Sequence, residues 1–139
     1  MSAPARAETE ASRTTLWAGR ALSALPVLFL LFDSAVKFTG IPPVVESFAR
    51  LGYPADIGPL IGALEMAGTV LYLVPRTSAL GAILLTGFLG GATATHLRVG
   101  DPVCTHVLFP FYVGLFLWAG LFFRDARLRA LVPRRTSAA

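Results

Sequence analysis

The sequence has little of what a protein needs on a water-exposed surface. Only 14% of its 139 residues are charged, whereas soluble domains carry about 25%. Hydrophobic residues make up 55% of the chain, and the mean hydropathy is +0.66. This composition excludes most soluble enzymes, disordered chains and coiled coils. It predicts a single membrane domain.

Cysteine and histidine are also scarce. Cys104 is the only cysteine, which excludes an intrachain disulfide, a CxxC redox pair and a thiolate zinc site. The two histidines, His96 and His106, flank a short loop and do not face each other from within a bundle, so we do not expect a haem. A metal bound by Glu65, His96 and Asp33 would have only three protein ligands and no HExxH-type spacing, so we do not expect a metal site either.

Four apolar stretches predict an all-α fold, an integral membrane four-helix bundle. About 20 apolar residues are needed to cross a hydrocarbon core of about 30 Å. We expect the four spans at residues 16–36, 57–74, 78–96 and 106–123. They belong to a membrane domain at 14–130. The N-terminal arm (1–13) and the tail (131–139) are rich in Ala, Ser, Thr, Arg and Glu, and we expect both to be disordered and cytoplasmic.

The basic residues are distributed unequally between the two sides of the predicted bundle. Nine of the twelve Lys and Arg residues lie on the side that holds both termini, and three lie on the other side, namely Lys37, Arg50 and Arg98. By the positive-inside rule, both termini are cytoplasmic. The basic residues flank apolar runs and are not interleaved with exposed aromatics, so nucleic-acid binding is not expected despite a pI of about 10.0.

The outer loop between the first two spans predicts a short amphipathic helix. Pro43 can begin this helix, and Glu46 and Arg50 are spaced for an i,i+4 ion pair on its polar face. Four apolar residues share the opposite face: Val44, Val45, Phe48 and Leu51. Such a helix either lies in the membrane interface or folds over the bundle as a lid, and both interpretations remain open.

Small residues indicate where the spans touch one another. Gly58 and Gly62 form a GxxxG spacing in the second span, and Gly87 and Gly91 form one in the third. Helices in lipid associate through close packing at such residues. Both pairs therefore predict helix contacts.

Four ionisable residues stand out within the predicted spans or at their ends, namely Asp33, Lys37, Glu65 and His96. An ionisable side chain at membrane depth is costly, so it needs a partner or a function. At a rise of about 1.5 Å per residue, all four reach the outer half of the bundle. Asp33 and Lys37 are four residues apart, with the acid first, which predicts an ion pair.

These residues predict a polar pocket that handles protons. Glu65, His96 and Asp33 are the candidate catalytic residues, because carboxylates and a histidine can exchange protons around an apolar cavity. Lys37 is a candidate ligand-binding residue. Four more polar residues can extend the ligand-binding cluster: Arg98, Tyr112, His106 and Asp101.

Several motifs follow one another along the chain: DSAVKFTG at 33–40, FARLGYP at 48–54, GALEMAG at 62–68, Pro75 with Leu80 and Gly81, ATATHLR at 92–98 and GDP at 100–102. In this order and spacing they resemble the DoxX-like family of small bacterial membrane proteins, over about residues 16–129. The resemblance implies a four-helix bundle in the bacterial inner membrane. The family name comes from a subunit of a quinone-linked thiosulfate oxidoreductase.

The leading functional hypothesis is an inner-membrane protein that binds a small hydrophobic ligand, such as a quinone or a lipid-soluble metabolite, in a polar pocket. Whether it also transforms this ligand by acid–base chemistry, as an enzyme, stays open. The first alternative is a non-catalytic accessory or assembly subunit of a larger membrane complex, and a homo-oligomer is a further form of partnership. A third hypothesis, a small proton-coupled exporter, is disfavoured by the unequal charge distribution and by a carboxylate in the second span.

Overall fold

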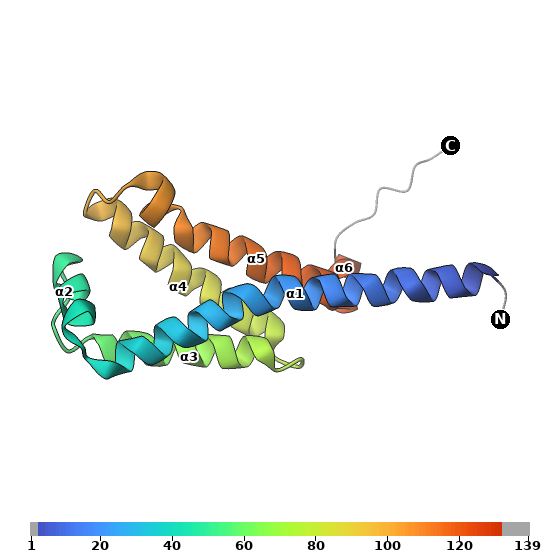
Figure 1. Ribbon diagram of the computed structural model, residues 1–139, viewed down its shortest axis with the longest axis horizontal. Coiled ribbons are helices and arrows are strands. Elements are labelled where there is room, and N and C mark those ends of the chain that lie inside the picture. Colours follow the sequence, from blue (N-terminus) through green and yellow to red (C-terminus); the bar gives the residue numbers. More distant parts are fainter. Residues whose placement is uncertain (1–2, 132–139) are drawn as a thin grey trace.

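The computed structural model describes residues 3–131, and it describes side chains from residue 13 onward (Figure 1). The described chain consists of helices and connecting turns, with no strand, which confirms the all-α prediction. The elements in order are α1 (Ala3–Thr39), α2 (Pro42–Arg50), α3 (Gly58–Leu73), α4 (Ser78–Arg98), the π-helical turn η1 (Val103–Val107), α5 (Phe109–Arg124) and α6 (Ala126–Leu131).

Within the described part of the chain, three helical segments are long and apolar enough to cross a membrane: Arg13–Thr39, Ser78–Arg98 and Val103–Arg124. They correspond to the first, third and fourth predicted spans. The helix α3 is also apolar but has only 16 residues, a length of about 24 Å. Length and composition thus support a membrane protein, with α3 shorter than the other candidate spans.

The N-terminal segment is helical where a disordered arm was expected, and the expected C-terminal tail is mostly not described. The helix α1 begins at Ala3, so residues 3–13 continue the first span as helix. Alanine, arginine and glutamate, which are frequent in this segment, are strong helix formers. Most of the expected tail, from residue 132 onward, lies outside the described residues.

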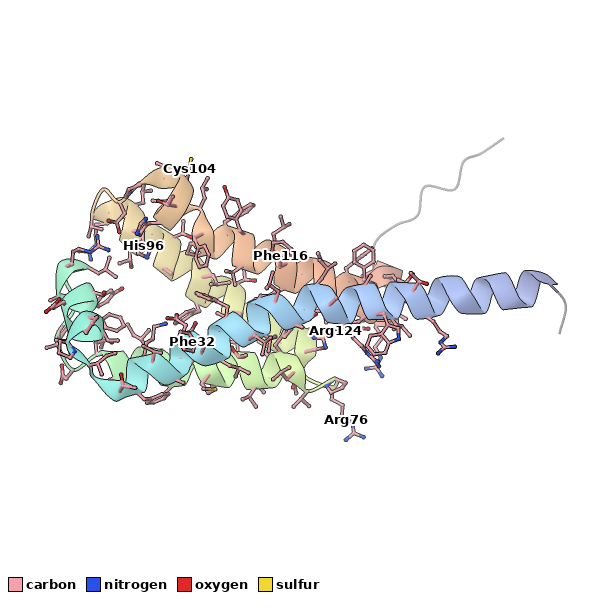
Figure 2. All side chains as sticks on the ribbon, viewed as in Figure 1. Phe32, Arg76, His96, Cys104, Phe116 and Arg124 are labelled. Carbon is pink, nitrogen blue, oxygen red and sulfur yellow. The ribbon has the colours of Figure 1, made fainter. Side chains whose placement is uncertain are left out.

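The four long helices form a closed ring of neighbours. The helix α1 packs against α3 and α5, and α4 packs against the same two helices from the other side. Figure 1 shows that α1 and α3 diverge from α4 and α5 toward the end of the bundle where α2 lies. We call this the α2 end. The opposite end is the arginine end, because Arg76 and Arg124 lie there (Figure 2).

The hydrophobic core lies in the part of the bundle where the helices converge. Its fully buried members include Leu30, Tyr72, Leu85 and Leu117. The Tyr72 hydroxyl donates a hydrogen bond to the Leu117 carbonyl (2.7 Å) and lies 2.9 Å from Ser23 Oγ. A Cβ atom on Gly81 would lie 2.2 Å from the Tyr72 backbone nitrogen. The backbones of α3 and α4 therefore touch here, which only glycine allows.

The two GxxxG pairs have different surroundings. A Cβ atom on Gly62 would lie 3.0 Å from both Lys37 Cβ and the Ser34 carbonyl oxygen, so α3 approaches α1 closely, as predicted. A Cβ atom on Gly87 or Gly91 would meet nothing within 4 Å. The predicted helix contact at this second pair is wrong, because these glycines line a cavity in the divergent half of the bundle.

Candidate functional site

A cavity of about 750 Å³ occupies the divergent half of the bundle, and all four long helices contribute to its walls. The helix α2 contributes Val44 and Phe48, and Leu51 follows it, so three of the four residues of the predicted apolar face line the cavity. Ser47 and Arg50 of α2 line it as well. Other apolar lining residues are Phe29, Phe88, Phe109 and Val113. The ionisable lining residues include Asp33, Lys37, Glu65, His96 and His106. The cavity is thus apolar with a small number of polar groups.

Lys37 connects two carboxylates on different helices. Its Nζ donates hydrogen bonds to Asp33, one turn earlier on α1, and to Glu65 Oε2 on α3 at 2.6 Å. The Glu65 side chain is 1% exposed, that of Lys37 14% and that of Asp33 38%. The predicted Asp33–Lys37 ion pair is confirmed. We refer to Asp33, Lys37 and Glu65 as the triad.

The triad forms because α1 and α3 lie unusually close together. Gly62 lies one turn before Glu65 and packs against Lys37 Cβ, which lets the lysine reach the buried carboxylate. On the other side, Lys37 Nζ lies 5.8 Å from the centre of the Phe88 ring on α4. A cation near an aromatic face is attracted to it, so Phe88 also stabilises the ammonium group.

A second polar cluster lies at the α2 end. His96 Nδ1 lies 2.6 Å from Asp101 Oδ2, and an Arg50 guanidinium nitrogen donates to Asp101 Oδ1 at 2.5 Å. The hydrogen bonds from Arg50 and from His96 lower the pKa of Asp101 below its ordinary value. The predicted pairing of Arg50 with Glu46 is wrong, because the charge of Asp101 is closer and is fixed by His96.

The remaining candidate residues lie at different distances from the cavity. His106 lines it, and its ring contacts that of His96 edge to face, with 5.8 Å between centres. Arg98 donates to the Leu51 carbonyl oxygen (2.6 Å) and thereby holds the C-terminus of α2. Tyr112 is 43% exposed and is not part of the cavity wall.

Some polar residues of the site carried no strong sequence signal. Tyr53, which follows α2, has its hydroxyl 3.0 Å from Thr95 Oγ1 on α4, and both residues line the cavity. A tyrosine after a loop helix and a threonine in an apolar span are common features, so only the fold relates them. Among the described side chains, no group of three His, Cys, Asp or Glu residues is arranged to hold a metal ion.

Comparison with known protein families shows to which family the chain belongs. The model of the DoxX-like family matches residues 21–120. The chain belongs to the DoxX-like family. The match includes the triad, α2 and the whole cavity wall, so the site is part of the DoxX-like domain. No curated protein and no solved structure has significant similarity to the chain.

Proposed function

We propose that this DoxX-like protein binds a small hydrophobic ligand in the cavity and that the triad provides its polar contact. The observation that carries the proposal is the position of Lys37 and the buried Glu65 on the wall of a 750 Å³ cavity. Ligand sites typically measure about 300–1,000 Å³, and they combine apolar walls with a few polar groups. A buried ion pair contributes little to stability on its own, so a binding role accounts better for its presence.

The hydrogen bonds of Lys37 support a ligand that carries an acceptor oxygen. A lysine ammonium group has three N–H donors. Two of them are directed to Asp33 and Glu65, which leaves one for a ligand. A carbonyl oxygen on a flat hydrophobic molecule, as in a quinone, satisfies this requirement, and Gly87 and Gly91 leave open space beside the cavity wall at their positions.

The histidines support proton exchange with such a ligand. The described hydrogen bonds engage Nδ1 of both His96 and His106, so Nε2 of each ring is available to a bound molecule. In this proposal Glu65, His96 and Asp33 carry protons in any reaction of the ligand, and Lys37 binds its oxygen. Acid–base or quinone-linked chemistry is then the reaction class.

We place the protein in the bacterial inner membrane with four crossings. The helix α3 packs between α1 and α4, so a bilayer that surrounds those two helices also surrounds α3. The nine Lys and Arg residues on the side of both termini support a cytoplasmic arginine end. The cavity then lies in the outer half of the bilayer, where a lipid-soluble ligand can reach it.

Native mass spectrometry of the protein, purified gently from its own membranes, tests the proposal. We expect a defined small-molecule mass on the wild-type protein and its loss in Glu65→Gln, which removes the charge without changing the size of the side chain. Glu46→Gln is the matched control, because Glu46 is exposed on α2, and this variant should retain the ligand. The proposal is wrong if no ligand is present or if both variants bind it equally. A bound second protein in place of a ligand would favour the accessory-subunit alternative.

A further inference from the structure

A second pocket, of about 390 Å³, lies at the arginine end of the bundle. It is formed by α1, the turn between α3 and α4, and the junction of α5 with α6. Four arginines line it together with one acidic residue, Asp125: Arg20, Arg76, Arg124 and Arg127. We propose that this pocket binds a phosphate group, either that of an anionic phospholipid or a free phosphate.

The charges of the four arginines are not balanced within the described protein. Among the side chains described, residues 13–131, the ion pairs involve Lys37, Arg50 and His96 but none of the pocket arginines. Asp125 uses one of its oxygens to accept a hydrogen bond from the Arg127 backbone nitrogen, at 2.8 Å. Positive charges gathered around one pocket repel one another, and a bound anion removes this repulsion.

Arg124 has donor groups that the described residues leave without acceptors. One of its terminal nitrogens donates to the Tyr72 carbonyl oxygen at 3.0 Å, and its guanidinium carbon lies 4.5 Å from the centre of the Tyr72 ring. Its Nε is buried and has no hydrogen-bond partner among the described residues. Buried N–H groups are nearly always paired. The other terminal nitrogen of Arg124 makes no hydrogen bond with the described residues and can donate to a phosphate oxygen in the pocket.

The pocket lies at the depth of lipid headgroups. Arg124 ends the candidate span Val103–Arg124, and Arg76 lies in the turn between α3 and α4, at the same end of the bundle (Figure 2). A bilayer around the apolar spans therefore has its phosphates near this pocket. Basic pockets between helices on the cytoplasmic side of a membrane bind anionic lipid headgroups.

Lipid titration in native mass spectrometry tests the proposal on the full-length protein in detergent. The probes are phosphatidylglycerol, phosphatidylcholine with the same acyl chains, and inorganic phosphate. Arg76→Gln and Arg127→Gln are the test variants, because both side chains are exposed and neither makes a hydrogen bond that holds the fold. Arg13→Gln is the control, with the same loss of charge at an exposed position outside the pocket.

We expect wild-type protein and Arg13→Gln to bind one phosphatidylglycerol with equal affinity. Each pocket variant should bind it about fivefold more weakly, and the double variant about 25-fold more weakly. Arginine-dependent binding of phosphatidylglycerol that inorganic phosphate does not displace identifies the lipid as the source. Arginine-dependent binding of inorganic phosphate itself identifies free phosphate. The proposal is overturned if neither probe binds, or if Arg13→Gln weakens binding as much as the pocket variants do.

Discussion

Replacing Lys37 with methionine should destabilise the protein more than replacing Asp33 with asparagine. Lys37 is the only described cation bonded to Glu65, whose side chain is 1% exposed. Removal of one partner from a buried ion pair leaves an uncompensated charge and costs about 3–5 kcal/mol. Asp33 is 38% exposed, so Asp33→Asn removes the less buried of the two partners of Lys37 and should cost clearly less than Lys37→Met.

A double variant separates the contribution of the ion pair to stability from that of the packing of the aliphatic part of Lys37. Lys37→Met with Glu65→Leu removes both charges and keeps side chains of similar volume. Replacing a buried pair by apolar residues is often neutral or stabilising, so this double variant should be clearly more stable than Lys37→Met alone. The expected coupling energy between the two positions is about 2–3 kcal/mol.

Equilibrium unfolding in mixed micelles with increasing SDS, followed by the fluorescence of the two tryptophans, measures these free energies. Asp33→Asn is the control in the same assay. Two results would refute the reasoning. The first is an equal cost for Lys37→Met and Asp33→Asn, and the second is a double variant whose cost equals the sum of its single changes.

Three further predictions concern packing, pH and topology. Gly81→Ala should lower the free energy of unfolding by about 3 kcal/mol or more, because its Cβ would collide with the Tyr72 backbone. Gly87→Ala should instead stabilise α4 by about 0.5–1 kcal/mol, since a Cβ atom there meets nothing within 4 Å. The same unfolding assay compares the two variants. Because the pKa of Asp101 is lowered in the folded protein, its ion pair stabilises the fold at pH values above the ordinary pKa of 3.8, and this stability is lost as the pH falls through the lowered pKa. Hydrogen exchange should therefore show the α2 backbone protected at neutral pH and exposed only in stronger acid. Cys104 is exposed at the α2 end, and a membrane-impermeant maleimide should label it in intact cells; labelling only after permeabilisation would contradict the proposed orientation.

Features set by local sequence were predictable. Long apolar runs with prolines at their ends predict the helices, and the i,i+4 spacing of Asp33 and Lys37 predicts their ion pair. The helix α2 was predictable because Pro43 begins an apolar face, and Gly52, two residues after the helix ends, has a positive φ of 80°, as glycine allows. Each of these depends on residues within a few turns of one another.

Features that depend on distant segments were not predictable. Arg50 and Asp101 are 51 positions apart, and no pattern in either segment indicates the other as its partner. The GxxxG spacing of Gly87 and Gly91 is the same whether the glycines face a helix or a cavity, so the sequence could not distinguish these cases. The contact of Arg124 with Tyr72 likewise requires knowledge of which helices are neighbours.

Under the proposed function, the attachment of α2 has a consequence for the rate at which a ligand would exchange. The bonds from Arg50 to Asp101, from Arg98 to the Leu51 carbonyl and from Tyr53 to Thr95 join α2 and its C-terminal turn to the α4 side of the cavity. Breaking them leaves the packed core at the other end of the bundle intact. For the proposed ligand, residence time would then be set by a few side-chain bonds at the rim rather than by movement of the spans. Because the Arg50 side chain is 54% exposed, salt screens its bond, and exchange should become faster as the ionic strength rises.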